Sequence, residues 1–226
     1  MEKIWLKSYP AGVPAEINID EYASLREVLE DSCAKFGPRP AYSCMGRTVT
    51  FTELDRLSAA FGAFLQGRGL AKGARVALMM PNVLQYPVCL FGILRAGYTV
   101  VNVNPLYTPR ELEHQLTDSG AEMIVVVENF AHTLAEVLAR TEVKHVIVSS
   151  IGEMLGLKGI LVDFVLRHVT KLIPAWNIPR ATRLSDALSE GGRRKLARVE
   201  LGHDDIAFLQ YTGGTTGVAK GAMLLH

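Results

Sequence analysis

Apolar and amphipathic stretches alternate through the middle of the chain. Four short apolar runs rich in valine and isoleucine predict buried β-strands. These runs are residues 76–80, 100–103, 124–127 and 146–148. Apolar residues recur at helical spacing between them and predict helices. The predicted helices are residues 84–96, 109–119 and 131–140. This alternation predicts an α/β fold, a mostly parallel sheet covered by helices that binds its ligands beyond the carboxyl ends of the strands.

Capping signals predict where several helices begin. Ser24 with Glu27 and Thr50 with Glu53 have the spacing of a capping box, and Thr108 precedes the helix of residues 109–119 with Pro109 in its first turn. A short hairpin is predicted between the first two helices, with strands at residues 42–44 and 48–50. Residues 1–22 are predicted to be irregular, and residues 23–226 to belong to the α/β domain.

The pattern changes between residues 154 and 176. Apolar residues at helical spacing are interrupted there by four basic side chains, which predicts an amphipathic helix over residues 154–173 with one basic face. Those side chains are Lys158, Arg167, His168 and Lys171. A helix of this composition can pack on its own domain or lie at an anionic membrane surface, and the pattern leaves both alternatives open.

Composition and charge place the chain among globular proteins. Of its 226 residues 49% are hydrophobic and 21% charged, which excludes an intrinsically disordered chain. The net charge of +1 gives no whole-chain argument for binding nucleic acid, so no nucleic-acid partner is expected. The three cysteines are odd in number and widely spaced, which favours reduced thiols in a cytoplasmic protein, and the chain begins without the pattern of a signal peptide. The densest His/Glu cluster, residues 111–114, is interpreted as a solvated helix face.

The segment YTGGTTGVAKG at residues 211–221 carries the clearest chemistry. It combines four glycines, three threonine hydroxyls and one ammonium group. These are Gly213, Gly214, Gly217, Gly221, Thr212, Thr215, Thr216 and Lys220. Glycines let the backbone approach a ligand closely, consecutive N–H groups form a concave anion site, and a lysine adds a compact positive charge. Because residues 205–211 read as a strand, the sequence predicts a strand–loop–strand phosphate-binding element. The bland alternative is a Gly/Thr-rich hairpin turn without a ligand.

The P-loop of NTPases is excluded for this segment. That motif requires a lysine that follows its glycine and precedes a serine or threonine. In this chain Lys220 precedes Gly221, and the residues after that glycine are alanine and methionine.

The segment at residues 211–221 resembles the signature loop of the acyl-adenylate-forming superfamily. LRAGY at 94–98, NPLYTPREL at 104–112 and DSGA at 118–121 resemble the second core motif of this superfamily, and TFTEL at 50–54 and GARVALMMPN at 73–82 resemble the first. IWLKSYPAGVP at 4–14 and MPNVLQYP at 80–87 are similar to the bacterial long-chain fatty-acid–CoA ligases. The resemblance spans nearly the whole chain and is weakest between residues 149 and 200.

The resemblance implies an activity and a set of site residues. Members of this family use ATP to activate a long-chain fatty acid to an acyl-adenylate and then transfer the acyl group to CoA. Tyr211 and the residues of the loop, together with Lys220 and Gly221, are implied to hold the phosphates of ATP. Lys220 and Thr212 are implied to be catalytic, with the Thr212 hydroxyl as a ligand of Mg²⁺. The residues alone do not choose among the three threonines. Gly213, Ala219 and Leu225 depart from the usual motif, and the first two loosen the loop without changing its charge.

The resemblance also sets expectations for the rest of the protein. We expect the chain to be the N-terminal part of a longer ligase, inactive alone, with the acyl tunnel, the ribose and CoA sites and a C-terminal catalytic lysine beyond it. The alternatives are another adenylating enzyme, such as an aryl–CoA ligase, and a non-catalytic nucleotide-binding module. A homodimer and a peripheral position on the inner face of the cell membrane both stay open.

Overall fold

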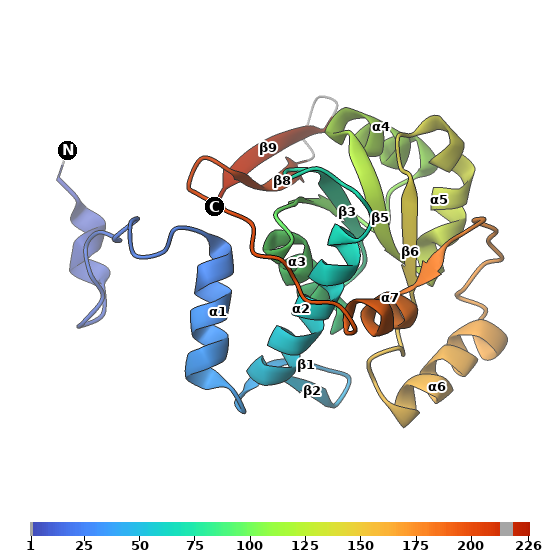
Figure 1. Ribbon diagram of the computed structural model, residues 1–226, viewed down its shortest axis with the longest axis horizontal. Coiled ribbons are helices and arrows are strands. Elements are labelled where there is room, and N and C mark those ends of the chain that lie inside the picture. Colours follow the sequence, from blue (N-terminus) through green and yellow to red (C-terminus); the bar gives the residue numbers. More distant parts are fainter. Residues whose placement is uncertain (1, 213–218) are drawn as a thin grey trace.

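A seven-stranded sheet forms the centre of the computed structural model, which describes residues 2–212 and 219–226 (Figure 1). The strands are β3 (Arg75–Met79), β4 (Thr99–Val103), β5 (Ala121–Val127), β6 (His145–Ser149), β7 (Thr182–Arg183), β8 (Ile206–Thr212) and β9 (Lys220–Leu225). Their order is β7-β6-β5-β3-β4-β8-β9, and every neighbouring pair is parallel except β8 with β9. The predicted α/β fold with a mostly parallel sheet is confirmed.

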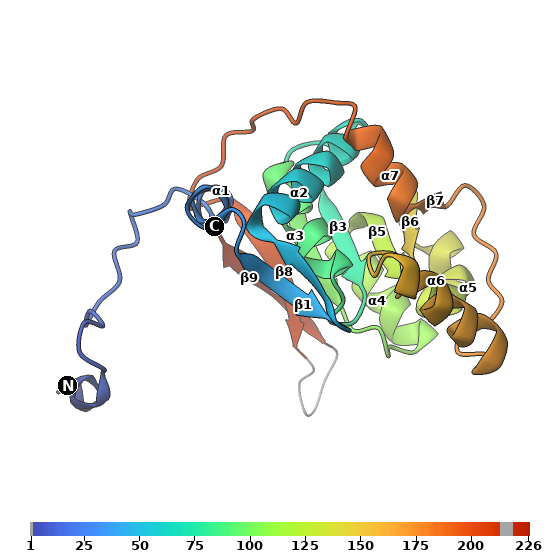
Figure 2. The same ribbon diagram turned by 90° about the horizontal axis from the view of Figure 1, so that it is seen from below.

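Helices cover both faces of this sheet, which explains why its central strands are apolar throughout. The helices are α1 (Leu25–Phe36), α2 (Phe51–Gln66), α3 (Gln85–Arg95), α4 (Pro109–Ser119), α5 (Ala131–Val137), α6 (Leu157–Phe164) and α7 (Leu184–Gly191). Phe61 of α2, Ile93 of α3 and Leu184 of α7 are buried in the core on one face. Leu112 and Leu116 of α4 and Leu134 of α5 are buried on the other. Figures 1 and 2 show the two layers on opposite sides of the strands.

Two of the three predicted helix starts have their capping bonds. The Thr50 hydroxyl accepts from the Glu53 N–H and the Glu53 carboxylate accepts from the Thr50 N–H, and Thr108 with Glu111 forms the same box before α4. The box predicted at Ser24 is wrong, although α1 does begin after this residue. The Glu27 carboxylate accepts instead from the N–H of Ala23, one residue earlier.

The N-terminal part of the chain lies outside the layered core. Residues 2–22 extend away from the domain and include one short helical turn, η1 (Ile4–Ser8) (Figures 1 and 2). The predicted hairpin is present as β1 (Pro40–Cys44) and β2 (Arg47–Thr50), which pair antiparallel beside α1 and α2. No helix in the described part of the chain is long and apolar enough to cross a membrane.

The helix predicted over residues 154–173 is shorter in the structure. The helix α6 begins after Gly156, whose φ is +64°, and runs into a π-helical turn, η4 (Val165–Val169). Lys171 then adopts a left-handed conformation with φ +52°, and residues 172–181 are irregular. The predicted basic face is also incomplete, because the Arg167 guanidinium is paired with the carboxylate of Glu128.

Candidate functional site

The carboxyl ends of β3 and β4 mark the point where the connections of the sheet diverge. The helix that follows β3 is α3 on one face, and the helix that follows β4 is α4 on the other. A crevice opens between adjacent strands at such a switch point, and open α/β sheets bind ligands there. The structure has a cavity of about 310 Å³ at this point, which we call the strand-end pocket. It is lined from β3, β4 and β8 and from the segments that follow β3 and β4.

Uncharged polar side chains line one part of the strand-end pocket and are bonded to one another. The Tyr86 hydroxyl donates to the Asn102 Oδ1 at 2.9 Å, and the Asn102 Nδ2 donates to the Gln210 Oε1 at 2.9 Å. Burial raises the pKa of Tyr86, which keeps its phenol protonated and able to donate. This ladder joins α3, β4 and β8 and fixes the position of Gln210, which immediately precedes the segment predicted to bind phosphate.

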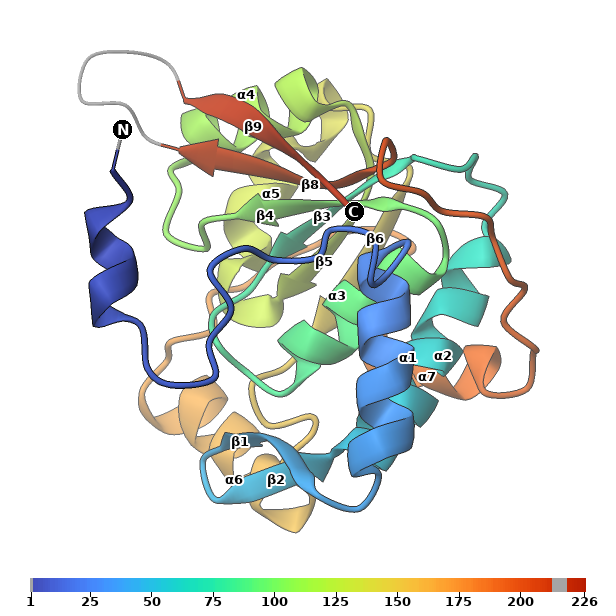
Figure 3. The same cartoon turned by 90° about the vertical axis from the view of Figure 1, so that its left-hand side faces the viewer.

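The strands β8 and β9 form an antiparallel hairpin (Figure 3). Gln210 and Tyr211 of β8 also line the strand-end pocket. Its register places Thr212 opposite Lys220 and Tyr211 opposite Gly221. Directly paired residues of an antiparallel ladder carry their side chains on the same face, with Cβ atoms about 4.5–5.5 Å apart. Thr212 and Lys220 are therefore side by side, and both are exposed. A hydroxyl and an ammonium group thus flank the two ends of the predicted loop.

The opposite face of the hairpin is fixed by Tyr211. Its hydroxyl donates to the Asp118 Oδ2 of α4 at 2.6 Å, and its ring is buried. Burial raises the pKa of Tyr211, and the hydrogen bond to Asp118 and its negative charge raise it further, so the phenol stays protonated. A methyl group at Gly221 would lie 2.9 Å from the Tyr211 Cε2, so the ring occupies the space that a side chain at position 221 would need.

The helix α4 contacts both β8 and the residue that precedes β9. Asp118 binds Tyr211 on β8, and the His114 Nε2 lies 3.3 Å from the carbonyl oxygen of Ala219, just before β9. His114 and Asp118 are four residues apart and share one face of the helix. The interpretation of residues 111–114 as a solvated helix face is therefore wrong for His114, which is half-buried against the hairpin.

The predicted site residues fall into two groups. The structure brings Tyr211, Thr212, Lys220 and Gly221 together at the mouth of the hairpin. The predictions for Gly213, Gly214, Thr215, Thr216 and Gly217 concern residues outside the part that the structure describes. Sequence reasoning missed Asp118, His114 and Asn102 as neighbours of this site. Asp118 begins the DSGA segment at residues 118–121, but its position in the sequence does not reveal a contact with a tyrosine 93 residues away.

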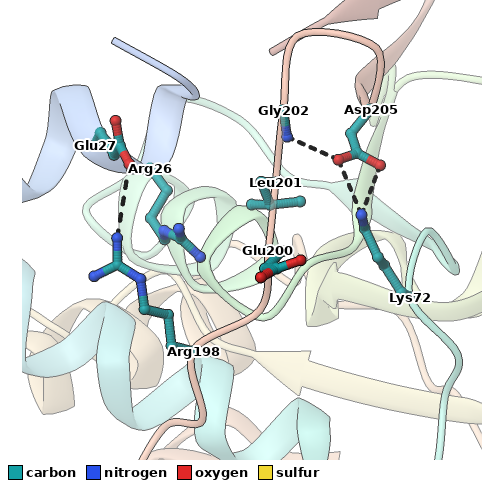
Figure 4. Close-up of a pocket in the computed structure, with 8 residues that line it drawn as sticks. All are labelled: Arg26, Glu27, Lys72, Arg198, Glu200, Leu201, Gly202 and Asp205. Carbon is teal, nitrogen blue, oxygen red and sulfur yellow. Dashed lines mark hydrogen bonds and ion pairs between the residues drawn. The ribbon is translucent and has the colours of Figure 1, made fainter.

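A larger cavity of about 540 Å³ lies near the start of β8 (Figure 4). Three basic and three acidic side chains line it: Arg26, Lys72, Arg198, Glu27, Glu200 and Asp205. The Lys72 Nζ lies 2.9 Å from the Asp205 Oδ1, and the Arg198 Nη2 lies 3.7 Å from the Glu27 Oε1. This cavity lies at the amino end of β8, and its charges balance within the lining. It therefore lacks both the position and the excess positive charge of a phosphate site.

No group of three or more His, Cys, Asp or Glu residues that could hold a metal ion occurs within residues 2–212 and 219–226. The described part of the hairpin offers Thr212 as an exposed oxygen ligand, next to the Lys220 ammonium. A metal at this position would therefore need most of its ligands from phosphate oxygens and water, which is the usual arrangement for Mg²⁺.

Comparison with known proteins shows the family to which the chain belongs. The family model described as "AMP-binding enzyme" matches residues 29–226. The chain belongs to the AMP-binding enzyme family. It is 58% identical to a long-chain fatty-acid–CoA ligase of Escherichia coli O157:H7 over the whole chain, and 57% identical to the ligase of Salmonella typhimurium. It is 33% identical to a long-chain fatty-acid–CoA ligase of Bacillus subtilis.

This AMP-binding enzyme chain spans 41% of the length of the Escherichia coli and Salmonella relatives and corresponds to their N-terminal part. Among solved structures, a long-chain fatty-acid–CoA ligase from Archaeoglobus fulgidus is similar with a TM-score of 0.70 and 26% identity, over 96% of this chain and 39% of that one. An anthranilate CoA ligase in complex with anthranoyl-AMP shares the fold, with a TM-score of 0.73 and 21% identity over 91% of this chain and 35% of that one.

Proposed function

We propose that this AMP-binding enzyme chain is part of a ligase that activates a long-chain fatty acid with ATP and transfers the acyl group to CoA. The observation that carries the proposal is the 58% identity to a long-chain fatty-acid–CoA ligase over the whole chain. The strand-end pocket beside the β8–β9 hairpin supports it, because the pocket lies where α/β sheets bind ligands.

The chemistry explains why such a site needs positive charge and N–H donors. In the first step a carboxylate oxygen of the fatty acid attacks the α-phosphorus of ATP, the bond to the β-phosphoryl oxygen breaks, and pyrophosphate leaves with the electron pair. The attacking group and the phosphate are both anions, so their repulsion must be screened. In the second step the sulfur of CoA attacks the acyl carbon, the thiol proton is lost, and AMP leaves.

Thr212 and Lys220 are assigned to the first step. The Lys220 ammonium would bind an oxygen of the phosphates and stabilise the charge that develops on the departing pyrophosphate. The Thr212 hydroxyl on the opposite strand would hold the Mg²⁺ that accompanies ATP. When bound, that ion neutralises charge on the phosphate oxygens. Tyr211 and Asp118 hold the hairpin against α4. The Thr212 hydroxyl and the Lys220 ammonium therefore keep their mutual position during the reaction.

Two assays test the proposed activity in the complete protein. Pyrophosphate exchange and acyl-adenylate formation are measured with acids of increasing chain length and with aryl acids. Long-chain acids should give the highest kcat/KM. A preference for aryl acids would favour an aryl–CoA ligase, and ATP binding without exchange for any acid would favour a non-catalytic nucleotide-binding module.

A charge deletion tests the assignment of Lys220. The Lys220→Ala variant should lose on the order of 100-fold in the exchange rate, the usual effect of removing one preorganised electrostatic group. Lys195→Ala removes the same charge from an exposed position elsewhere and serves as the control. Equal rates for the two variants would contradict the assigned role.

We also propose that α6 touches the inner face of the cell membrane. Leu157, Ile160, Leu161 and Phe164 are 87%, 71%, 65% and 56% exposed, and their spacing places them along one side of the helix. Exposed Lys158, His168 and Lys171 lie in or next to this segment. An exposed apolar row near basic side chains is typical of helices that lie on anionic bilayers.

The end of this helical segment is attached to the domain through Arg167. The carboxylate of Glu128 is fully buried and accepts two hydrogen bonds of 2.7 Å from Arg167, so the end of the helical segment is held to the sheet.

Vesicles containing phosphatidylglycerol should sediment the complete protein, whereas the Leu157→Ser/Leu161→Ser variant should stay in solution. Leu106→Ser changes an equally exposed leucine outside this row. Equal sedimentation of both variants would refute the contact.

A further inference from the structure

A third, more enclosed cavity lies between the end of α2 and the amino ends of β6 and β7. Its volume is about 190 Å³. Four basic side chains line it, Arg68, Lys144, His145 and Arg180, and no carboxylate of the described residues does so. We call it the basic pocket. The strands β3, β5 and β6 are parallel. The basic pocket at the amino end of β6 and the strand-end pocket at the carboxyl ends of β3 and β4 therefore lie at opposite ends of the strands.

The positive charges of the basic pocket are only partly compensated. The Lys144 Nζ lies 2.6 Å from the Glu122 carboxylate. Arg68 is paired with Glu190, but Glu190 is also bound at 2.9 Å by Arg194, so two guanidinium groups share one carboxylate. Arg180 forms no ion pair with any residue in the described ranges. Positive charge therefore exceeds negative charge around the cavity.

Two arginines of the basic pocket have unusual features, Arg68 in its surroundings and Arg180 in its backbone conformation. The Arg68 guanidinium lies 4.1 Å above the ring of Phe64, and its Nε is buried without a hydrogen-bond partner among the described residues. An unpaired buried donor is unfavourable and calls for a ligand or a water molecule. Arg180 has a left-handed backbone with φ +64°, a conformation that non-glycine residues seldom adopt and that tends to occur at functional sites.

The electrostatic state of His145 agrees with a positive potential in this cavity. Burial lowers the pKa of His145, and the charges of Arg68 and Lys144 lower it further, whereas Glu122 acts in the opposite direction. The imidazole is therefore neutral at pH 7. It can gain a proton if an anion enters and offsets the neighbouring cations.

We propose that the basic pocket binds a small phosphate-class anion, either inorganic phosphate or the phosphate group of a monoester. Arg68 and Arg180 offer planar arrays of N–H donors that match phosphate oxygens, and Lys144 adds a third cation. The small volume suits one phosphate group with a short organic part against the Phe64 ring and the apolar strand residues. This site is separate from the proposed ligase chemistry.

Calorimetric titration with inorganic phosphate tests the proposal in the complete protein. All proteins carry Lys220→Ala so that the predicted ATP loop contributes little, and sodium chloride keeps the ionic strength constant. We expect one saturable site, and at least a ten-fold weaker affinity when Arg180→Ala is added. Arg193→Ala, an exposed arginine outside the cavity, is the matched control and should leave the affinity unchanged.

Further measurements separate the outcomes. Arg180→Lys should recover part of the affinity, and the thermal unfolding temperatures without phosphate show whether the Arg180→Ala protein is folded. A phenyl phosphate that binds more tightly than inorganic phosphate identifies a monoester as the ligand class, and equal affinities identify the free anion. No saturable binding, or equal losses from Arg180→Ala and Arg193→Ala, would overturn the proposal. Because the readout is binding and not acyl transfer, its failure leaves the ligase proposal intact.

Discussion

The Tyr211 hydroxyl donates a 2.6 Å hydrogen bond to Asp118, and this bond joins the end of β8 to the last turn of α4. It links two segments that are 93 residues apart and that both carry family motifs. The tyrosine immediately precedes Thr212, so the bond fixes the strand where the predicted phosphate loop begins. The role of Tyr211 that the structure supports is to position the hairpin.

The first prediction concerns this bond. The Tyr211→Phe substitution keeps the ring and removes only the hydroxyl, so the free energy of unfolding should fall by about 1 kcal/mol. Because Asp118 is exposed and can bind water in place of the phenol, the loss should not be larger. Chemical denaturation measures the change, and Tyr9→Phe at an exposed site is the control. An unchanged stability together with an unchanged KM for ATP would argue against a positioning role.

The second prediction concerns the glycine opposite that tyrosine. The Gly221→Ala substitution places a methyl group 2.9 Å from the Tyr211 ring, so either the ring or β9 must shift. The expected loss of stability is roughly 1–3 kcal/mol, as for other overpacked positions. The rate of pyrophosphate exchange should fall as well, because Lys220 is the adjacent residue. Gly202→Ala has no heavy atom within 4 Å of the new methyl group and should have little effect.

Local signals predicted the sheet and most of the helices. The helix α4 has the predicted bounds because Thr108, Pro109 and Glu111 define its start and Gly120, in a left-handed conformation, defines its end. The strands β3, β4, β5 and β6 were predicted because their apolar runs are buried on both faces, whereas β7 was not predicted. The segment after residue 154 was harder to predict, because its end depends on a left-handed Lys171 and on the contact between Arg167 and Glu128.

The sequence predicted the site as one continuous motif and could not supply its neighbours. The register that pairs Thr212 with Lys220 follows from the hairpin, but the contacts of Asp118 and His114 depend on how α4 crosses β8 and β9. Asn102 lies inside an apolar strand, where nothing local distinguishes a polar residue that binds Gln210 from one that weakens the strand. Such pairings are tertiary and have no fixed spacing in the sequence.

The third prediction concerns the buried carboxylate that holds the end of the α6 segment. The Glu128→Gln substitution keeps the size of the side chain and removes the charge bound by Arg167 and Arg183. The loss of stability should be about 2 kcal/mol, within the usual range for hydrogen bonds to charged groups, because both arginines are half-exposed and can be solvated.

Trypsin provides the second measurement for this substitution. Cleavage at Lys171 should be faster in the Glu128→Gln protein, because the segment that carries Lys171 loses its attachment to the sheet. Glu136→Gln changes an exposed glutamate on α5 and should leave the cleavage rate unchanged. If cleavage of the Glu128→Gln protein proceeds at the parental rate, the ion pair does not hold this segment.

The fourth prediction is a dependence of stability on pH. The pKa of His145 is lowered by burial and by Arg68 and Lys144, so the unfolded chain binds its proton at a higher pH than the folded protein. The free energy of unfolding should therefore decrease as the pH falls below about 6.5, the ordinary pKa of histidine, and level off below the folded pKa. In phosphate-free buffer His145→Gln should reduce this slope, whereas exposed His168→Gln should not. Identical slopes for the two variants would contradict the assignment of this pH dependence to His145.

The antiparallel strand β9 closes the described sheet on one side and has β8 as its only partner there. Its outer backbone groups have no strand to bond with inside the described chain, and Met223, Leu224 and Leu225 are 67%, 47% and 52% exposed. An exposed, apolar edge strand of this kind can pair with a strand of another molecule. Preparations of these 226 residues alone should therefore self-associate as their concentration rises, which light scattering would detect.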